Sequence, residues 1–139
     1  MALLQGCPVG HRDSRLSHMV SHTNRELTLM LAGSKPLAAF LLDGDLTEDQ
    51  AFSGQPFQAH VEAGRILRFE TEVQQNGLSM RRILFTLPGE EWRVEAYCRL
   101  MDSMSEGWSD AKERQEGILL GYTDAENDAH IARLRTANP

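Results

Sequence analysis

Residues 67–89, LRFETEVQQNGLSMRRILFTLPG, carry the strongest periodic pattern of the chain. Apolar side chains alternate with polar or charged ones on both sides of Asn76-Gly77, which is the period of half-buried β-strands. Asn-Gly favours a two-residue type I′ turn, the turn that joins neighbouring antiparallel strands. Pro88-Gly89 ends the second run. The stretch therefore predicts an antiparallel β-hairpin.

Upstream of the hairpin, Leu37–Leu42 is an uninterrupted apolar run between Pro36 and Gly44. A run of this length is typical of a strand that is covered on both faces. Phe57–Ala63 is a weaker candidate for a further strand beside the hairpin. Together with the hairpin, these segments predict a sheet of three to four strands.

Other segments have the apolar spacing of helices and a residue pair that can cap the first turn. The expected helices are Asn24–Ala32 with Thr23 and Glu26 as a capping box, a short turn opened by Thr47 and Gln50, Glu90–Ser103, a helix opened by Asp110 and Glu113 that ends at Leu120, and a last helix opened by Thr123 and Glu126. Strands and helices do not alternate along the chain. We therefore expect an α+β fold, an antiparallel sheet with helices packed on one face.

The expected domain organisation is an irregular lead over residues 1–22 and a single α+β domain over residues 23–139. The side chains that the strand and helix patterns assign to one common core are Leu67, Phe69, Ile83, Phe85, Val94, Tyr97 and Met101. The 139-residue chain is long enough to bury such a core.

The charge balance excludes some classes of partner. Lys and Arg number 14 and Asp and Glu number 20, so the net charge is −6. An acidic chain lacks the clustered cations that neutralise nucleic-acid phosphates or anionic lipids. No apolar run approaches the length that spans a bilayer, and we expect a cytoplasmic protein. The 2 cysteines, Cys7 and Cys98, are expected to be reduced thiols.

The end of the Leu37–Leu42 run reads Asp43-Gly44-Asp45-Leu46-Thr47. This Asp-x-Asp-x-Thr pattern after an apolar strand resembles the first motif of the haloacid-dehalogenase-like phosphotransferases. The resemblance implies a doubly wound parallel sheet, with Asp43 as the phosphoryl-accepting nucleophile and Asp45 as the general acid and base. It also implies a Mg²⁺ ion held by both carboxylates, with Asp124 and Asp128 in a loosely similar acidic last motif. A small magnesium-dependent phosphohydrolase is the alternative function.

A second group of potential ligands lies near the amino terminus. Cys7, His11, His18 and His22 offer one thiolate and three imidazoles, a donor set sufficient for zinc. Their spacing matches no zinc module, and the segment lacks the periodicity that would hold four ligands in a tetrahedron. We expect no zinc here and no other cofactor.

Acidic side chains gather in two places. Asp43, Asp45, Glu48 and Asp49 share one loop. The second group, beside Trp92, consists of Glu90, Glu91 and Glu95. Trp108 stands outside any amphipathic stripe and is either an exposed anchor for a partner or a packed corner residue. An acidic surface steers a basic partner.

The leading functional hypothesis is a small acidic protein without a catalytic set that acts by binding another protein, as an inhibitor, immunity protein or adaptor does. Trp108 and the acidic loop are its expected binding residues. A homodimer is an open alternative.

Overall fold

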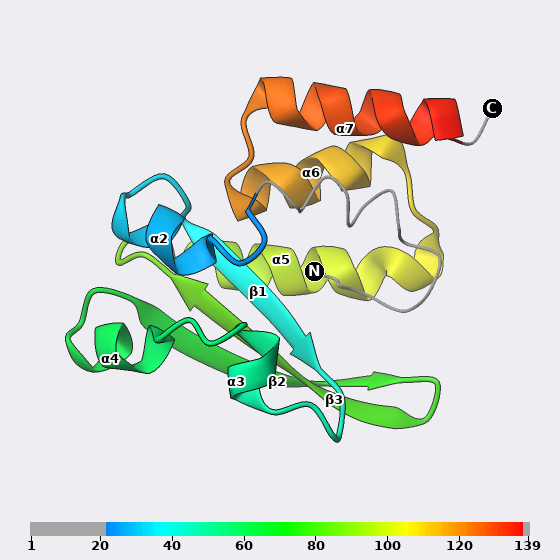
Figure 1. The fold of residues 1–139 in the computed structure, drawn as a ribbon. Coiled ribbons are helices and arrows are strands. Elements are labelled where there is room, and N and C mark those ends of the chain that lie inside the picture. Colours follow the sequence, from blue (N-terminus) through cyan, green and yellow to red (C-terminus); the bar gives the residue numbers. More distant parts are fainter. Residues whose placement is uncertain (1–21, 138–139) are drawn as a thin grey trace.

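The structure is a computed structural model that describes residues 22–137 of the chain. Its elements follow in the order α2 (Glu26–Leu31), β1 (Leu37–Leu42), α3 (Glu48–Ala51), α4 (Phe57–Glu62), β2 (Leu67–Gln75), β3 (Leu78–Thr86), α5 (Trp92–Asp102), the 3₁₀ helix η1 (Ser103–Glu106), α6 (Asp110–Leu120) and α7 (Asp124–Ala137) (Figure 1). None of the helices in this part of the chain is long and apolar enough to cross a bilayer.

The described strands form one antiparallel sheet in the order β1-β3-β2. The predicted hairpin is confirmed: Gln75 pairs with Leu78 across the turn. Asn76 and Gly77 both have positive φ, 54° and 79°, as a type I′ turn requires. The α+β class is therefore confirmed, with three strands over residues 22–137.

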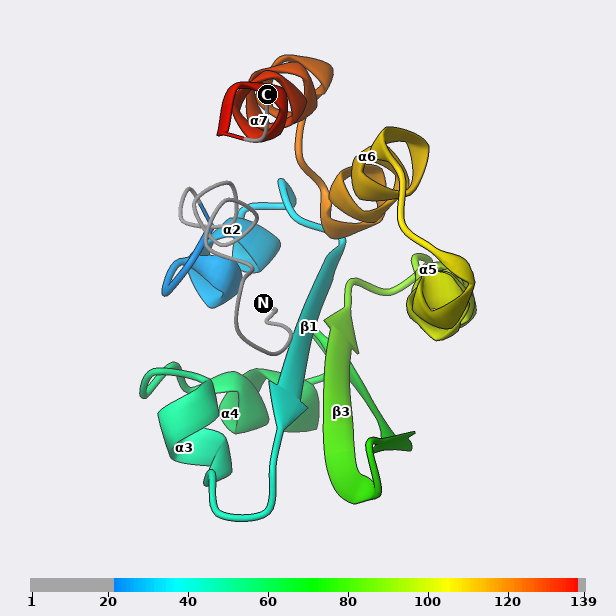
Figure 2. The ribbon, with the colours of Figure 1, turned by 90° about the vertical axis from the view of Figure 1, so that its right-hand side faces the viewer.

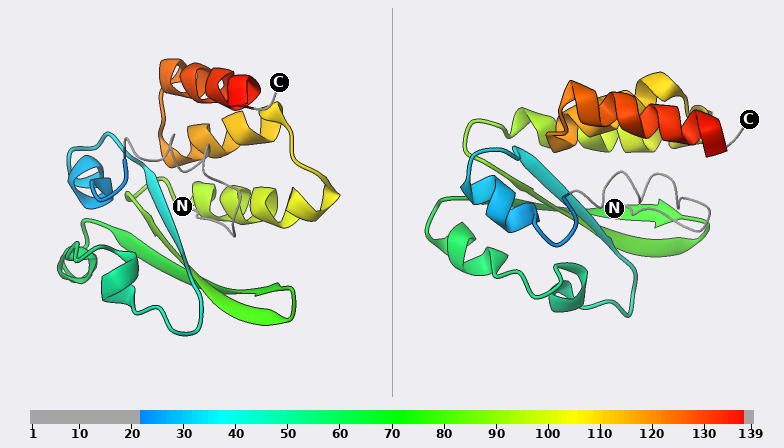
Figure 3. Two further views of the ribbon diagram at one scale, coloured as in Figure 1. Left: turned by 45° about the vertical axis from the view of Figure 1, so that its right-hand side comes forward. Right: turned by 45° about the horizontal axis from the view of Figure 1, so that its top comes forward.

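Helices cover both faces of the sheet, which corrects the expectation of one covered face. Figure 2 shows α3 and α4 on one side of β1 and β3, and α5 on the other. The views in Figure 3 agree, with α2 beside α3 and α4, and α6 and α7 beyond α5. The strand Leu37–Leu42 is accordingly covered on both faces, as its uninterrupted apolar run predicts.

In the part of the chain that the structure describes, two hydrophobic clusters replace the single predicted core. The first joins α2, α3 and α4 to one sheet face through buried residues that include Met30, Leu42, Phe52, Phe57, Ile83 and Phe85. The second joins α5 and α6 to the other face through Leu37, Leu84, Tyr97, Leu100, Leu119, Leu120 and Tyr122. The register explains the division, because Phe69 pairs with Leu84 and Arg68 with Phe85. Phe69 and Phe85 thus face opposite sides of the sheet.

Phe57–Ala63 is helical rather than a strand. Phe57 and Val61 both pack against the first cluster, and a helix places residues four apart on the same face. Pro56 at the helix N-cap has no N–H to donate to a sheet. The strand prediction for this segment is therefore wrong.

Two of the predicted helix starts differ in detail. The N-cap of α2 is Arg25 and has no side-chain cap, so the capping box at Thr23 is wrong. The N-cap of α6 is Ser109, whose hydroxyl accepts the N–H of Lys112, so the expected cap at Asp110 is wrong by one residue. Glu113, the expected partner of that cap, is instead buried in the interior.

The other two capping boxes are confirmed. Thr47 and Gln50 cap α3 reciprocally. Before α7, Thr123 accepts the N–H of Glu126, and the Glu126 carboxylate accepts the N–H of Thr123. These bonds satisfy donors that a helix start otherwise leaves open.

Helices α6 and α7 approach closely where Gly117 faces Asn127. A Cβ on Gly117 would lie 1.9 Å from the Asn127 side-chain oxygen. The Asn127 amide is buried and donates to the carbonyl of Tyr122 at 3.4 Å. Gly117 therefore makes room for a buried polar side chain on the neighbouring helix.

Candidate functional site

The structure does not bring together the four aspartates of the two phosphotransferase motifs: Asp43 and Asp45 lie far from Asp124 and Asp128. Asp43 and Asp45 are exposed in the loop after β1, where the N–H of Asp45 donates to Asp43 Oδ1 at 3.3 Å. Figures 1 and 2 place this loop at the opposite end of the molecule from α7, which carries Asp124 and Asp128. Asp128 instead pairs with Arg114 at 2.5 Å. The parallel sheet that the resemblance implies is also wrong, because the described sheet is antiparallel.

Glu48, assigned to the acidic loop, belongs to an ion-pair cluster on β2 and β3. Arg68 donates to both of its carboxylate oxygens, at 3.0 and 2.9 Å, and Arg81 donates at 3.2 Å. The same arginines bond Glu70 at 3.1 Å each. Hydrogen bonding to Arg68 lowers the pKa of both Glu48 and Glu70. Glu48 is therefore neutralised within the chain, while Asp49 is exposed on α3.

Over residues 22–137 no three His, Cys, Asp or Glu side chains come together as metal ligands. Cys7, His11 and His18 of the proposed zinc set lie outside the described residues. His22 is described, and its ring stacks on Tyr122 with 3.7 Å between the ring centres. Its Nδ1 lies 2.9 Å from Lys35 Nζ.

We expect Asp43→Asn to change the free energy of unfolding by no more than about 0.5 kcal/mol, because the side chain is exposed and the amide oxygen keeps the bond to Asp45. Mg²⁺ should not shift the urea midpoint of either protein. Thermal or urea unfolding with Mg²⁺ and with chelator checks this expectation. A Mg²⁺-dependent phosphatase activity that is lost in Asp43→Asn would contradict it and restore the phosphohydrolase hypothesis.

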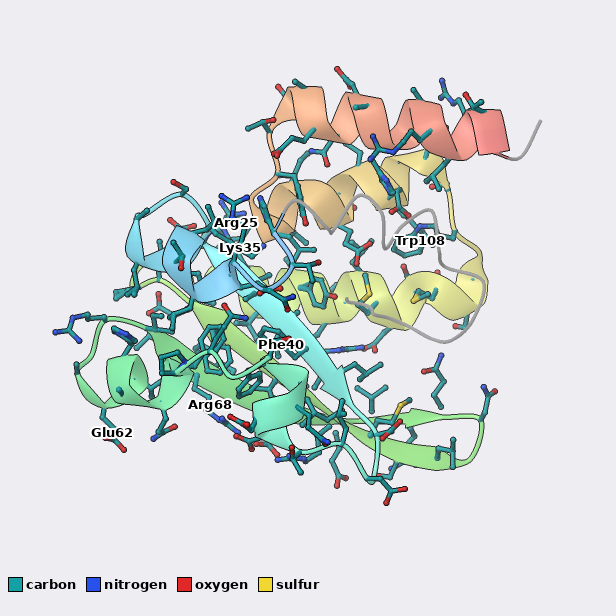
Figure 4. All side chains as sticks on the ribbon, viewed as in Figure 1. Arg25, Lys35, Phe40, Glu62, Arg68 and Trp108 are labelled. Carbon is teal, nitrogen blue, oxygen red and sulfur yellow. The ribbon has the colours of Figure 1, made fainter. Side chains whose placement is uncertain are left out.

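Trp108 is half-buried and belongs to a buried polar group between α6 and α7. Its Nε1 donates to Glu113 Oε1 at 2.6 Å, and His130 Nε2 lies 2.7 Å from Glu113 Oε2. An open cavity of about 300 Å³ adjoins this group. Its lining residues are Trp108, Ser109, Asp110, Glu113, Leu134 and Arg135. Figure 4 shows Trp108 in the connection that leads into α6. The indole is therefore half-buried beside this cavity, and its N–H is already bonded within the chain.

Trp92 and Ile118 form a more exposed apolar surface. Trp92 is 59% exposed at the start of α5, and Ile118 is 47% exposed in the last turn of α6. The Arg93 guanidinium joins them: its carbon lies 4.6 Å from the centre of the Trp92 ring, and its Nη1 donates to the carbonyl of Ile118 at 3.1 Å. We call these three residues the Trp92 surface.

Lys35, in contrast to the exposed Trp92 surface, is buried. It is 2% exposed, and its Nζ donates to the carbonyl of Leu120 at 2.6 Å. The ring of Tyr122 lies 5.3 Å from the same nitrogen. Burial lowers the pKa of Lys35 from 10.5 to about 7, although Glu26 and Glu126 act to raise it.

Lys35 and Arg93 together cap the carboxyl end of α6. Arg93 donates to the carbonyls of Ile118 and Leu119, and Lys35 donates to that of Leu120. Cations near the carboxyl end of a helix satisfy its last carbonyls and its negative dipole end. Two cations that are distant in the sequence thus bond carbonyls at the same helix end.

Sequence reasoning missed Lys35, Glu113 and His130. Lys35 is one of only two lysines in the chain and lies two residues before a buried strand. This is an unusual place for a cation and was an available signal. The pairing of Glu113 with His130 joins two helices and has no local signature.

No family model, curated protein or solved structure matches this chain.

Proposed function

We propose that this protein acts by binding a basic protein, and that the Trp92 surface is its contact site. The observation that supports the proposal is the exposure of Trp92, an indole left 59% open to solvent beside an exposed isoleucine. Tryptophan is among the residues that contribute most to protein interfaces, because a large apolar side chain can be buried at low entropic cost.

The Trp92 surface is ordered before any partner arrives. Arg93 Nε bonds Glu90 at 2.7 Å while its Nη1 bonds the end of α6. The guanidinium is thus held between Glu90, just before α5, and the end of α6, and the indole lies against it. Holding side chains in place before association lowers the conformational entropy that binding costs.

Acidic side chains set the chemistry of the partner. Glu91 and Glu95 are exposed on the turn of α5 that carries Trp92. Glu95 is three residues after Trp92, so its carboxylate lies on the same side of α5 as the indole, while Glu91 precedes the helix and accepts the N–H of Gly89. Arg99 pairs with Glu95 at 3.2 Å, but both side chains are largely exposed and such a pair is weak. An apolar contact with an acidic rim suits a segment with Lys or Arg around an aliphatic or aromatic side chain.

The Trp92 surface fits binding better than the site expected from the sequence. Trp108 already donates its N–H to Glu113, and Glu48 is paired with two arginines. Trp92 and Ile118, by contrast, are 59% and 47% exposed and offer apolar area that a partner can cover.

A peptide display library provides the test, with the full chain as bait. We expect selected peptides to combine basic residues with an aromatic or aliphatic anchor and to bind less tightly as salt is raised. Trp92→Ala should weaken their binding by about 2 kcal/mol, roughly thirtyfold in Kd. Fluorescence anisotropy of a selected peptide measures this loss.

Leu78→Ala is the matched control, because Leu78 is the most exposed large apolar side chain of the described residues and lies at the hairpin turn. Equal losses in Trp92→Ala and Leu78→Ala would contradict the proposed site. Selected peptides without basic residues would contradict the proposed partner. Self-association of the wild-type chain that Trp92→Ala abolishes would identify a second copy as the partner instead.

A further inference from the structure

Two basic nitrogens face each other where the segment before α2 meets the end of α6. Lys35 Nζ and His22 Nδ1 are 2.9 Å apart. Lys35 is 2% exposed and His22 is 9% exposed, so water screens their charges poorly. Figure 4 shows Lys35 between α2, the start of β1 and the end of α6.

The contact between these nitrogens depends on how many protons they hold. With His22 neutral, the lysine donates one N–H to Nδ1 and another to the carbonyl of Leu120. With His22 protonated, Nδ1 carries a hydrogen and cannot accept, so the contact needs a neutral amine as acceptor. The pair therefore tolerates one positive charge. A second proton places two positive charges 2.9 Å apart in a buried site.

The carboxylates that act on Lys35 do not outweigh its burial. Glu26 on α2 and Glu126 on α7 act on Lys35 through space and raise its pKa, while Tyr122 in the α6–α7 turn presents the face of its ring. Burial outweighs both carboxylates and lowers the pKa of Lys35 to about 7. The amine is thus partly neutral near neutral pH, where an ordinary lysine is fully charged.

We propose that Lys35 and His22 form an acid-sensitive latch, which holds the segment before α2 against the turn between α6 and α7 and releases it when both side chains are protonated. Release removes the imidazole from the face of Tyr122 and the ammonium from the carbonyl of Leu120. The latch does not involve the Trp92 surface, so it stands or falls independently of the proposed binding function.

The direction of the pH effect follows from the pKa of Lys35. The amine has a pKa of 10.5 when exposed and about 7 in the folded chain. Between these values the unfolded chain binds a proton that the folded chain does not, so the stability rises with pH from about 7 to 10.5. This stability is absent at and below about pH 7, where the amine is charged in both states.

NMR of the full chain with ¹⁵N-labelled lysine tests the titration. The only lysines of the chain are Lys35 and Lys112, so the variant Lys112→Arg has a single lysine Nζ signal, that of Lys35. We expect that signal to titrate near pH 7. A titration at the ordinary lysine value would overturn the proposal.

Hydrogen exchange of the Arg25 amide tests the release, because this N–H bonds the carbonyl of residue 22 at 2.9 Å. After correction for the intrinsic effect of pH, its protection should persist through the Lys35 titration, which gives the pair one positive charge, and fall at lower pH, where the second proton binds. The ring-proton shifts of His22 should lose the effect of Tyr122 over the same range. Protection and ring shifts that stay constant well below the ordinary histidine pKa of about 6.5 would refute the latch.

Each of two variants removes one of the two groups that bind a proton in the latch. His22→Gln keeps an acceptor that cannot be protonated, and Lys35→Met removes the amine. In both, the loss of Arg25 protection should move to lower pH by about one unit or more. His60→Gln is the matched control, because His60 is on α4 beside Arg65 and does not contact the latch. The same shift in His60→Gln, or no shift in His22→Gln, would contradict the proposal. If Lys35→Met does not fold, His22→Gln and the wild-type titrations test the proposal without it.

Discussion

Phe85→Ala is expected to lower the free energy of unfolding by about 4 kcal/mol, because the substitution removes a fully buried ring and leaves a cavity. Phe85 stacks on Phe57 with 4.2 Å between ring centres. Phe52 and Phe40 meet it edge to face at 5.3 and 6.1 Å. The ring therefore connects β3 to β1 and to the segments around α3 and α4. Urea unfolding followed by circular dichroism measures the loss.

Two control variants separate the loss of the buried Phe85 ring from the general effect of shortening a side chain. Phe85→Leu retains most of the volume and should cost about half as much or less. Leu78→Ala removes an exposed side chain and should cost no more than about 0.5 kcal/mol. A loss below about 1 kcal/mol in Phe85→Ala would show that the four phenylalanines do not pack as one cluster.

Gly117→Ala is expected to destabilise the protein by about 3 kcal/mol, the opposite of the usual gain of about 1 kcal/mol when alanine replaces glycine inside a helix. The new Cβ would lie 1.9 Å from the Asn127 oxygen and 2.8 Å from its Cγ. Either α6 and α7 move apart or the buried amide leaves its bond to Tyr122, and both cost free energy. Thermal and urea unfolding measure the change.

A double-mutant cycle isolates the contact between these helices. Asn127→Ala alone loses buried contacts, but it also removes the atoms that clash with a side chain at position 117. In that background Gly117→Ala should be neutral or stabilise by up to about 1 kcal/mol. Gly44→Ala is the control, because a Cβ there meets no atom within 4 Å. Additive effects of the two substitutions would contradict the described packing of α6 on α7.

The hairpin and the order of most elements could be predicted because their signals are local. Asn76-Gly77 determines the turn, and two capping boxes mark helix starts. The division of the core also follows from that turn: pairing Gln75 with Leu78 pairs Phe69 with Leu84 and leaves Phe85 on the opposite face. The sequence prediction combined the two faces because it used the alternation within each strand without the register between strands.

The candidate sites could not be predicted because they join residues distant in the chain. Lys35 bonds a carbonyl 85 residues away, and Arg93 bonds one 25 residues away. Trp108 was the expected anchor, yet it is half-buried, and Trp92 at the first position of α5 is the exposed tryptophan. Periodicity describes the middle of a helix, whereas exposure at its ends depends on which other elements approach.

The close approach of Gly117 and Asn127 also has an evolutionary consequence. Gly117 has no room for a methyl group because Asn127 fills the adjacent space. Substitutions at these two positions should therefore occur together in evolution, since either one alone is selected against. Divergent sequences with this fold are therefore expected to carry a smaller residue at position 127 whenever position 117 is larger than glycine. That paired substitution, ten positions apart across one turn, would identify distant relatives in which the hairpin sequence has changed beyond recognition.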